Sequence, residues 1–354
     1  MSDMPTLAEM PLPWQQDAWH ALSARLLDGK LPHGLLIIGQ SGIGKGLFAM
    51  AFARLALCRN PRDGRPCGVC SGCAQFDAGS HPDFSRVTFE EREGKAGEEG
   101  ALKLNISVEQ IRTLIGDLQL RSHQGGRKVA VIEPADGMSI AAANSLLKTL
   151  EEPPAETLLL LVSSAPGRLP ATIRSRCQVV VLPPPETSQA LGWLQARLTR
   201  DDWPVLLAFC GGAPLAALEL AATDIGVRRK AFFETLARLR AGQANPIMLA
   251  AVPKDRHPEL LKLLWSFTAD LILLKSGGES RLVNRDQLPL LQKAADGIHL
   301  RSLHAFLDRV QLAIQALDSS VNRELGLAVL LADWAGGLDD IKGSPLADTA
   351  WGNT

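Results

Sequence analysis

The chain has 354 residues, of which 46% are hydrophobic and 21% charged, so it is long enough for two or three globular domains. Its 37 Lys and Arg residues balance 38 Asp and Glu residues, which excludes a protein that binds nucleic acid through a global basic excess. Residues 1–10 lack the pattern of a secretory signal, and Lys262 and Asp270 interrupt the most apolar late stretch, 260–274. We therefore expect a cytoplasmic protein without a membrane span.

The first predicted elements are a helix over 14–29, a strand over 35–38 and an apolar helix over 46–57. A glycine-rich segment, Gly39-Gln40-Ser41-Gly42-Ile43-Gly44-Lys45-Gly46, joins the strand to the second helix. This order and spacing match the phosphate-binding loop G-x-x-x-x-G-K-[ST], with one departure at the last position.

The residue types of this loop predict a nucleotide site with a damaged metal position. Gly39, Gly42 and Gly44 let backbone N–H groups surround phosphate oxygens, and the helix that follows presents its positive end to them. We expect Lys45 to reach the outer phosphates. Gly46 stands where a Ser or Thr hydroxyl would ligate Mg²⁺, and glycine has no side chain for this purpose.

Four of the six cysteines follow the second helix with the spacing C-x8-C-x2-C-x2-C, at Cys58, Cys67, Cys70 and Cys73. In a reducing compartment, metal binding explains such a cluster better than disulfides do. Four thiolates close a tetrahedral Zn²⁺ site without an open position, which indicates a structural metal. We expect the Gly- and Pro-rich segment between them to be a loop that folds around the ion.

The middle of the chain alternates between predicted strands and helices. We expect a strand over 84–89, a solvated loop over 90–100, and a helix that begins with a capping box at Ser107 and extends to Leu118. A buried strand over 128–132 follows.

The residues that end this strand argue against hydrolysis. In a phosphate-loop ATPase, an acid at this point holds Mg²⁺ and a following Glu polarises water. Here Glu133 has the first position, one methylene longer than Asp, and Pro134 has the second and cannot act as a base. Asp136 lies two residues too far along to substitute without moving. With Gly46, two required positions have the wrong chemistry, so we expect hydrolysis to be lost while nucleotide binding can survive.

A helix over 139–152, a strand over 158–162, the triplet Ser175-Arg176-Cys177 and a strand over 178–182 complete this part. Counting strands gives a five-stranded α/β nucleotide-binding domain. Pro183-Pro184-Pro185 marks a boundary, and no strand pattern follows. We expect short helices between 187 and 222, a loop over 276–286, and longer helices over 228–240, 246–251, 258–275, 287–296, 302–317 and 322–334.

Three features together resemble the clamp-loader branch of the AAA+ ATPases. They are the four-cysteine module after the phosphate-loop helix, the run Leu146-Leu147-Lys148-Thr149-Leu150-Glu151-Glu152-Pro153-Pro154, and Ser175-Arg176-Cys177. The resemblance covers essentially the whole chain. It implies a phosphate-loop domain over 1–182 with its zinc module at 58–73, a helical lid over 183–226, a helical collar for oligomerisation over 227–340, and a flexible tail over 341–354.

The departures from the family pattern imply a subunit that does not hydrolyse ATP. Gly46, Glu133-Pro134 and Leu215 stand where a motor subunit has Ser or Thr, Asp-Glu and a lid Arg. Arg176 is retained, and in the family it acts in trans as an arginine finger on a neighbour's ATP. The alternative interpretation of Arg176 is a structural arginine that pairs with a carboxylate near a strand start. Arg174, two residues away, either assists Arg176 or has no part in the site. The resemblance thus implies a stator in the clamp loader of bacterial DNA polymerase III, within a nucleotidyltransferase assembly.

The implied partners are motor (gamma/tau) and delta subunits in a hetero-pentamer, with the sliding clamp and primed DNA reached through the complex. The implied cofactors are a structural Zn²⁺ and, less directly, ATP or ADP. Two other functions stay open at this point. One is a degenerate but active motor ATPase, which Gly46 and Pro134 disfavour. The other is a zinc-bearing DNA-binding module on an ATPase fold, which the neutral net charge disfavours.

Overall fold

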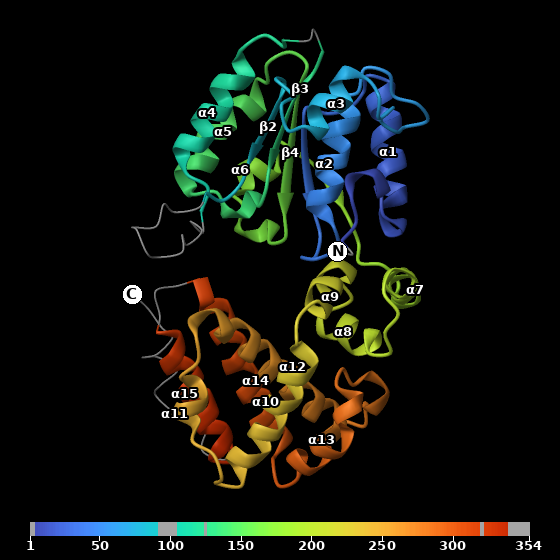
Figure 1. Ribbon diagram of the computed structural model, residues 1–354. Helices are drawn as coiled ribbons and strands as arrows, with labels where there is room; N and C mark the ends of the chain where they lie inside the picture. Colours follow the sequence, from blue (N-terminus) through green and yellow to red (C-terminus); the bar gives the residue numbers. More distant parts are fainter. Residues whose placement is uncertain (1–3, 91–104, 124–125, 319–321, 339–354) are drawn as a thin grey trace. The chain divides into compact units, whose positions relative to one another are not determined.

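The computed structural model describes residues 4–90, 105–123, 126–318 and 322–338. The chain separates into two compact units, which we describe individually (Figure 1). Unit 1 comprises Met1–Trp203 and Cys210–Glu219, and unit 2 comprises Pro204–Phe209 and Leu220–Thr354. The expected domain boundaries at 182, 226 and 340 stay predictions.

Unit 1 is built on one parallel sheet of five strands. The strand order is β2-β3-β4-β1-β5, so β1 lies between β4 and β5 and its carboxyl end is flanked by theirs. The strands are β1 (Gly34–Ile38), β2 (Phe84–Val87), β3 (Lys128–Ile132), β4 (Thr157–Ser163) and β5 (Gln178–Val181). The five predicted strands are confirmed, with ends that differ by at most two residues.

Helices cover both faces of this sheet, and the alternation of strand side chains explains why (Figure 1). Leu35 and Ile37 of β1 enter a core shared with α1 and α2, whereas Leu36 between them enters a second core shared with α4, α5 and α6. The helices are α1 (Gln16–Leu27), α2 (Lys45–Ala56), α3 (Ser71–Asp77), α4 (Val108–Gln119), α5 (Ile140–Glu151) and α6 (Ala171–Arg174).

The predictions for α1, α2, α4 and α5 are confirmed, whereas α3 and the short α6 were not predicted. Cys73 lies inside α3, a helix that the sequence did not predict because glycines dominate the segment before it. The Ser107 capping box at the start of α4 is present, with Gln110 N–H donating to the Ser107 hydroxyl over 3.3 Å. Apart from Glu90, the loop expected over 90–100 lies outside the described residues.

After β5 the described residues contain helices and no further strand. The helices are α7 (Thr187–Arg197), α8 (Trp203–Phe209), α9 (Pro214–Ala221), α10 (Ile225–Arg240), α11 (Pro246–Ala250), α12 (His257–Lys275), α13 (Leu288–Ala295), α14 (Leu300–Gln315) and α15 (Arg323–Ala335). Short 3-10 turns lie at Leu7–Glu9, Pro13–Gln15, Ala135–Gly137, Pro166–Arg168, Lys254–Arg256, Glu279–Arg281, Arg285–Gln287 and Ala316–Asp318. The predicted helices are therefore present, and the loop expected over 276–286 contains one complete 3-10 turn and the start of another.

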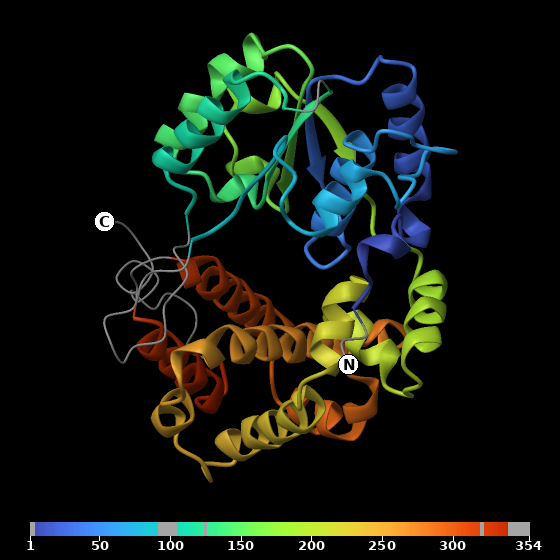
Figure 2. The same ribbon diagram turned by 45° about the horizontal axis from the view of Figure 1, so that its top comes forward.

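Unit 2 is entirely helical in its described part (Figure 2). Its core is aromatic: Phe267 packs against Phe233, with ring centroids 4.8 Å apart, and against Trp334 at 5.5 Å. The Trp334 indole N–H donates to the Leu236 carbonyl oxygen over 2.8 Å, which satisfies its one polar atom. No single described helix is long and apolar enough to cross a membrane; α8 and α9 reach that length only when added together across a bend.

Candidate functional site

The phosphate loop connects the carboxyl end of β1 to the amino end of α2. Gly42 and Gly44 have φ angles of +80° and +89°, in the left-handed region that favours glycine, and Gly44 is the N-cap of α2. The carbonyl oxygen of Ile43 accepts from Trp14 Nε1 (2.9 Å) and Gln15 Nε2 (3.0 Å). Two residues before α1 therefore fix the loop conformation.

Lys45 is the buried cation of this site, with only 6% of its surface exposed. Its ammonium donates to the Gln40 carbonyl oxygen over 2.7 Å and to the Ser164 hydroxyl over 2.9 Å. Burial lowers the pKa of Lys45, while the charges of Glu133 and Asp136 oppose that shift. The lysine is therefore held by neutral acceptors and only weakly compensated by carboxylates.

The space beside Gly46 is filled by Glu133. A Cβ atom added at position 46 would lie 2.0 Å from Glu133 Oε1, so a side chain there requires Glu133 to move. Arg86 Nη2 donates to Glu133 Oε2 over 3.2 Å and holds the carboxylate in this place. The glycine that removes a metal ligand thus makes room for the longer acid at the end of β3.

These residues line one cavity of about 400 Å³. Its wall includes Gly42, Gly44, Lys45, Gly46, Glu133 and Arg86. Helix α9 closes one side: the N–H of Leu215 donates to the Gly42 carbonyl oxygen over 3.0 Å, and its buried side chain supplies no charge. A Cβ atom at Gly39 would lie 2.4 Å from the Leu182 carbonyl oxygen, so this glycine serves close packing of the loop.

Pro134 and Asp136, which lie near the position of a hydrolytic base, have structural contacts. Pro134 lines the cavity and has no acid or base to offer. Asp136 lies in the turn Ala135–Gly137, and its Oδ1 accepts from the backbone N–H of Ser164 over 3.1 Å. That contact orients Ser164, the partner of Lys45, at the end of β4.

The four predicted metal ligands come together. The sulfur atoms of Cys58, Cys67, Cys70 and Cys73 all lie within 4.8 Å of one another. The distance from Cys58 Sγ to Cys70 Sγ is 3.9 Å. Four thiolates around Zn²⁺ at about 2.3 Å would be separated by about 3.8 Å, so the arrangement fits a tetrahedral ion.

The surroundings of the sulfur atoms suit a cation. The N–H of Cys67 donates to Cys58 Sγ (3.2 Å) and that of Cys73 to Cys70 Sγ (3.4 Å), as expected around thiolates. Burial raises the pKa of the Cys73 thiol, and a bound cation would oppose this shift because it favours the thiolate. Arg54 and Asp77, paired at 2.6 Å, connect α2 to α3 and fix the module to the domain.

The Ser175-Arg176-Cys177 triplet lies between α6 and β5. Cys177 is buried in the core, where burial raises the pKa of its thiol to about 11, so it is an inert anchor. A Cβ atom at Gly34 would lie 3.5 Å from both Cys177 Sγ and the Arg176 carbonyl oxygen, so this segment packs closely against the start of β1. The Arg176 side chain, in contrast, is 34% exposed.

Arg176 is bound to the end of α5. Its Nε donates to Glu151 Oε1 over 2.8 Å, and Nη2 contacts the same oxygen. Its Nη1 donates to the Thr172 carbonyl oxygen (3.0 Å) and the Ser175 hydroxyl (3.3 Å). Arg174 is exposed, and the sequence alone did not reveal the partner of Arg176 on α5.

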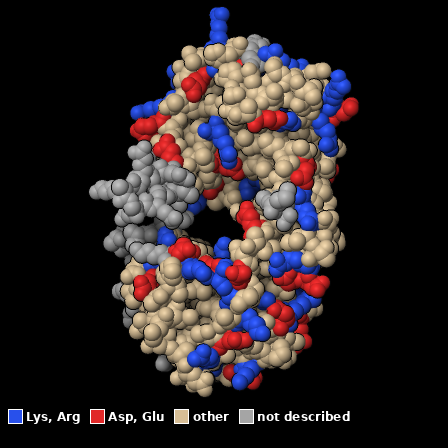
Figure 3. All heavy atoms as spheres, in the orientation of Figure 1, with Lys and Arg blue, Asp and Glu red and all other residues tan. Residues whose placement is uncertain are grey.

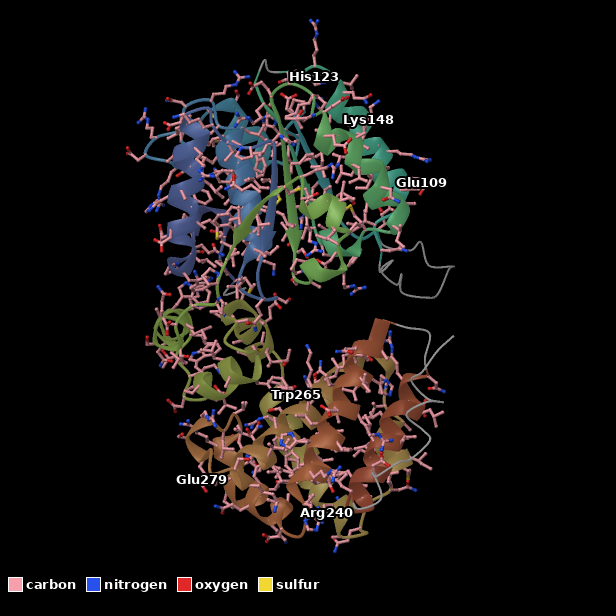
Figure 4. The ribbon with its side chains drawn as sticks, turned by 180° about the vertical axis from the view of Figure 1, so that it is seen from behind. Glu109, His123, Lys148, Arg240, Trp265 and Glu279 are labelled. Atoms are coloured by element: carbon pink, nitrogen blue, oxygen red, sulfur yellow. The ribbon has the colours of Figure 1, made fainter. Side chains whose placement is uncertain are left out.

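The run that contains Glu151 is divided between core and solvent. Leu146, Thr149 and Leu150 are buried, whereas Lys148 projects outward from α5, as Figure 4 shows. The His33 ring lies 2.9 Å from the Leu150 carbonyl oxygen, which ties the end of this helix to the start of β1. His33 thus has a structural position in unit 1.

Sequence reasoning missed several residues of these sites: Trp14, Gln15, Arg86, Glu151 and Ser164. Only Ser164 carried a signal, because it follows β4, whose carboxyl end meets that of β1. The others depend on contacts between segments far apart in the chain.

Charged side chains on the visible faces are mixed in sign within each unit, without a continuous basic surface (Figure 3). This distribution agrees with the balanced composition and gives no electrostatic footprint for nucleic acid on that view.

Comparisons with known proteins agree with the resemblance in the sequence. A family model described as "DNA polymerase III, delta subunit" matches residues 14–186, and one described as "DNA polymerase III, delta subunit, C terminal" matches residues 227–336. The chain is 33% identical over 333 residues to the DNA polymerase III subunit delta' of Pseudomonas aeruginosa, covering 91% of this chain and 97% of that protein.

Two further relatives extend the comparison. The DNA polymerase III subunit delta' of Escherichia coli K12 is 33% identical over 323 residues, covering 90% of this chain and 93% of that protein. The DNA polymerase III subunit tau of Salmonella typhimurium is 33% identical over 163 residues, covering 46% of this chain and 23% of that protein.

Proposed function

The chain belongs to the delta-prime family of DNA polymerase III subunits, and from this premise we propose that it is the non-hydrolysing stator of a clamp loader. In this function it helps to load the sliding clamp onto primed DNA and supplies Arg176 to the ATP site of a neighbouring subunit. Its own phosphate loop does not turn over ATP.

The state of the phosphate loop supports the absence of turnover. Gly46 provides no hydroxyl for Mg²⁺, and Glu133 fills the space beside it. Pro134 provides no base, and Leu215 provides no charge from α9. Each of these changes removes a different part of the machinery for phosphoryl transfer.

The observation that carries the proposal is the contrast between that incomplete pocket and a well-anchored, exposed Arg176. A buried Cys177 and a close-packed Gly34 fix the backbone, while the guanidinium is accessible from solvent. An arginine that reaches a neighbour's triphosphate stabilises the charge of the transition state and raises turnover by about 10³-fold or more.

The proposed partners are motor subunits of the gamma/tau type and a delta subunit, in a hetero-pentamer that unit 2 helps to assemble. Similarity to a tau subunit over 163 residues supports a place among such subunits. Contacts with the clamp and with primed DNA would be made through the assembly. The proposed location of the protein is the cytoplasm.

The proposed cofactor is one structural Zn²⁺ on the four cysteines, supported by the sulfur geometry. Metal analysis of the purified chain should give one zinc per chain, and a metal-free, folded protein would contradict the ligand assignment. Binding of ATP or ADP at the loop stays a prediction, which equilibrium dialysis with and without Mg²⁺ checks.

The test is ATP hydrolysis by a reconstituted clamp loader that contains this chain. Arg176→Ala should reduce turnover at the partner's site by about 10³-fold while assembly is unchanged. Arg174→Ala, two residues away and also exposed, decides between its two interpretations: a helper would lower turnover when removed, and a residue outside the site would leave turnover near wild type. Full turnover with Arg176→Ala would overturn the proposal.

The purified chain by itself tests the two alternative functions. ATP hydrolysis by the purified chain alone would establish a degenerate motor ATPase. Tight binding of DNA by the isolated chain, weakening steeply with salt, would establish a DNA-binding module.

A further inference from the structure

The hydrogen bonds of Arg176 leave its guanidinium largely occupied. A guanidinium has five N–H donors. The Nε–H and one Nη2–H point to Glu151, and the two Nη1–H groups have the Thr172 carbonyl oxygen and the Ser175 hydroxyl as acceptors. One N–H of Nη2 is left, whereas a bidentate contact with a phosphate needs two parallel donors.

The side chain therefore cannot clamp a phosphate in this conformation. The bond from the Arg176 N–H to the Ile173 carbonyl oxygen (3.1 Å) and the burial of Cys177 fix the backbone. Only the side chain can move, and moving it means leaving Glu151.

We propose that Glu151 is a latch that holds Arg176 in a resting position until a neighbour's triphosphate displaces it. This inference rests on the proposed function, since it assigns regulation to the same arginine. The latch gives Arg176 two alternative anionic partners, the carboxylate of its own chain and the phosphates of the next.

Exposure of the pair makes such an exchange feasible. The side chains of Arg176 and Glu151 are 34% and 49% exposed, so water screens their attraction and the contact is easily broken. A triphosphate carries more negative charge than one carboxylate and offers several acceptor oxygens, so it competes well for the guanidinium. An unoccupied or diphosphate-loaded neighbour competes less well, and Arg176 then stays on Glu151.

The latch predicts that removing the charge of Glu151 frees the arginine. In the reconstituted clamp loader without primed DNA, Glu151→Gln should raise ATP turnover by about two- to five-fold, the range expected for losing one exposed ion pair. Glutamine keeps the size of the side chain, so the end of α5 should be undisturbed.

Two variants make the test specific. Glu152→Gln removes the same charge from the next residue, which is exposed and lacks a described ion pair, and it should leave turnover unchanged. The double variant Glu151→Gln with Arg176→Ala should behave as Arg176→Ala alone, because the latch acts only through the arginine.

The outcomes separate this inference from the function on which it rests. If Arg176→Ala keeps full turnover, the proposed function fails. If Arg176→Ala loses turnover but Glu151→Gln matches Glu152→Gln, only the latch fails. A fall in turnover with Glu151→Gln also overturns it, since Glu151 would then hold Arg176 in its active position instead of restraining it.

Discussion

Lys45 in the phosphate-loop pocket and Arg176 between α6 and β5 belong to the same unit, but they differ in exposure and in the charge of their partners. Lys45 is 6% exposed and bonded to a carbonyl and a hydroxyl oxygen. Arg176 is 34% exposed at its side chain and paired with a carboxylate. Lys45 is thus a buried cation with fixed partners, whereas Arg176 lies near the surface in an ion pair that water screens and that breaks easily.

The two sites also differ in what the neighbouring acid does. At the pocket, the acid that could help a metal instead packs beside Gly46, under a contact from Arg86. At the other site, the acid holds an arginine that stays within reach of solvent. A buried lysine with neutral partners suits architecture, whereas an exposed arginine with a reversible partner suits action on another molecule.

The largest expected effect compares the two cations directly. Lys45→Met in the reconstituted clamp loader should leave partner turnover within about two-fold, whereas Arg176→Ala should lower it by about 10³-fold. The physical reason is that the Arg176 side chain lies partly exposed and reaches a foreign phosphate once it leaves Glu151, whereas Lys45 is buried in its own pocket. Equal losses from the two variants, measured with assembly intact, would remove the distinction between the sites.

A smaller effect concerns the space shared by Gly46 and Glu133. Gly46→Ala gains helix propensity but displaces Glu133 from Arg86, so it should be less stabilising than Gly116→Ala by about 1 kcal/mol. Gly116 is the matched control, because a Cβ atom there meets nothing within 4 Å.

Thermal unfolding followed by circular dichroism measures this difference. In a Glu133→Ala background, Gly46→Ala should become more favourable by about 1 kcal/mol, whereas the effect of Gly116→Ala should not change. A difference that persists there would mean that Glu133 does not occupy the place beside position 46.

The smallest effect is a pH dependence at Lys45. Burial holds the folded-state pKa of Lys45 below 10.5, because the charged form is destabilised in the folded protein. This cost to folding stability is fully present below the folded-state pKa and disappears as the pH rises toward 10.5. Wild type should therefore gain stability relative to Lys45→Met as pH is raised from neutrality toward that value. A stability difference between wild type and Lys45→Met that stays constant over this pH range would disprove the burial argument.

Much of the fold could be predicted because its signals are local. Runs such as Val129–Ile132 are buried on both faces and consist of β-branched and small apolar residues, a pattern that predicts a buried strand. The cysteine spacing also predicted a cluster correctly, since two C-x2-C steps bring sulfurs together by short chain segments. Helix α3 was missed because its apolar residues are too few to form a period.

The rest could not be predicted because it depends on distant contacts. Arg176 and Glu151 are 25 residues apart, and Arg86 and Glu133 are 47 apart. Glu133 was recognised by its place after a buried strand, but nothing in the local sequence pairs either acid with its arginine. The sequence indicated what Gly46 lacks, but only the packing of β3 against α2 revealed what fills its place.

The contact between position 46 and Glu133 also links amino-acid replacements at these two positions. Starting from a Ser or Thr at 46 and an Asp at 133, lengthening the acid first would drive it into the hydroxyl-bearing side chain. The glycine must therefore come first or together with the glutamate. Once both are present, restoring a side chain at 46 alone meets the carboxylate, with a Cβ only 2.0 Å from its oxygen. A returning hydroxyl therefore involves both positions: a new side chain at 46 and a carboxylate at 133 that turns away from it.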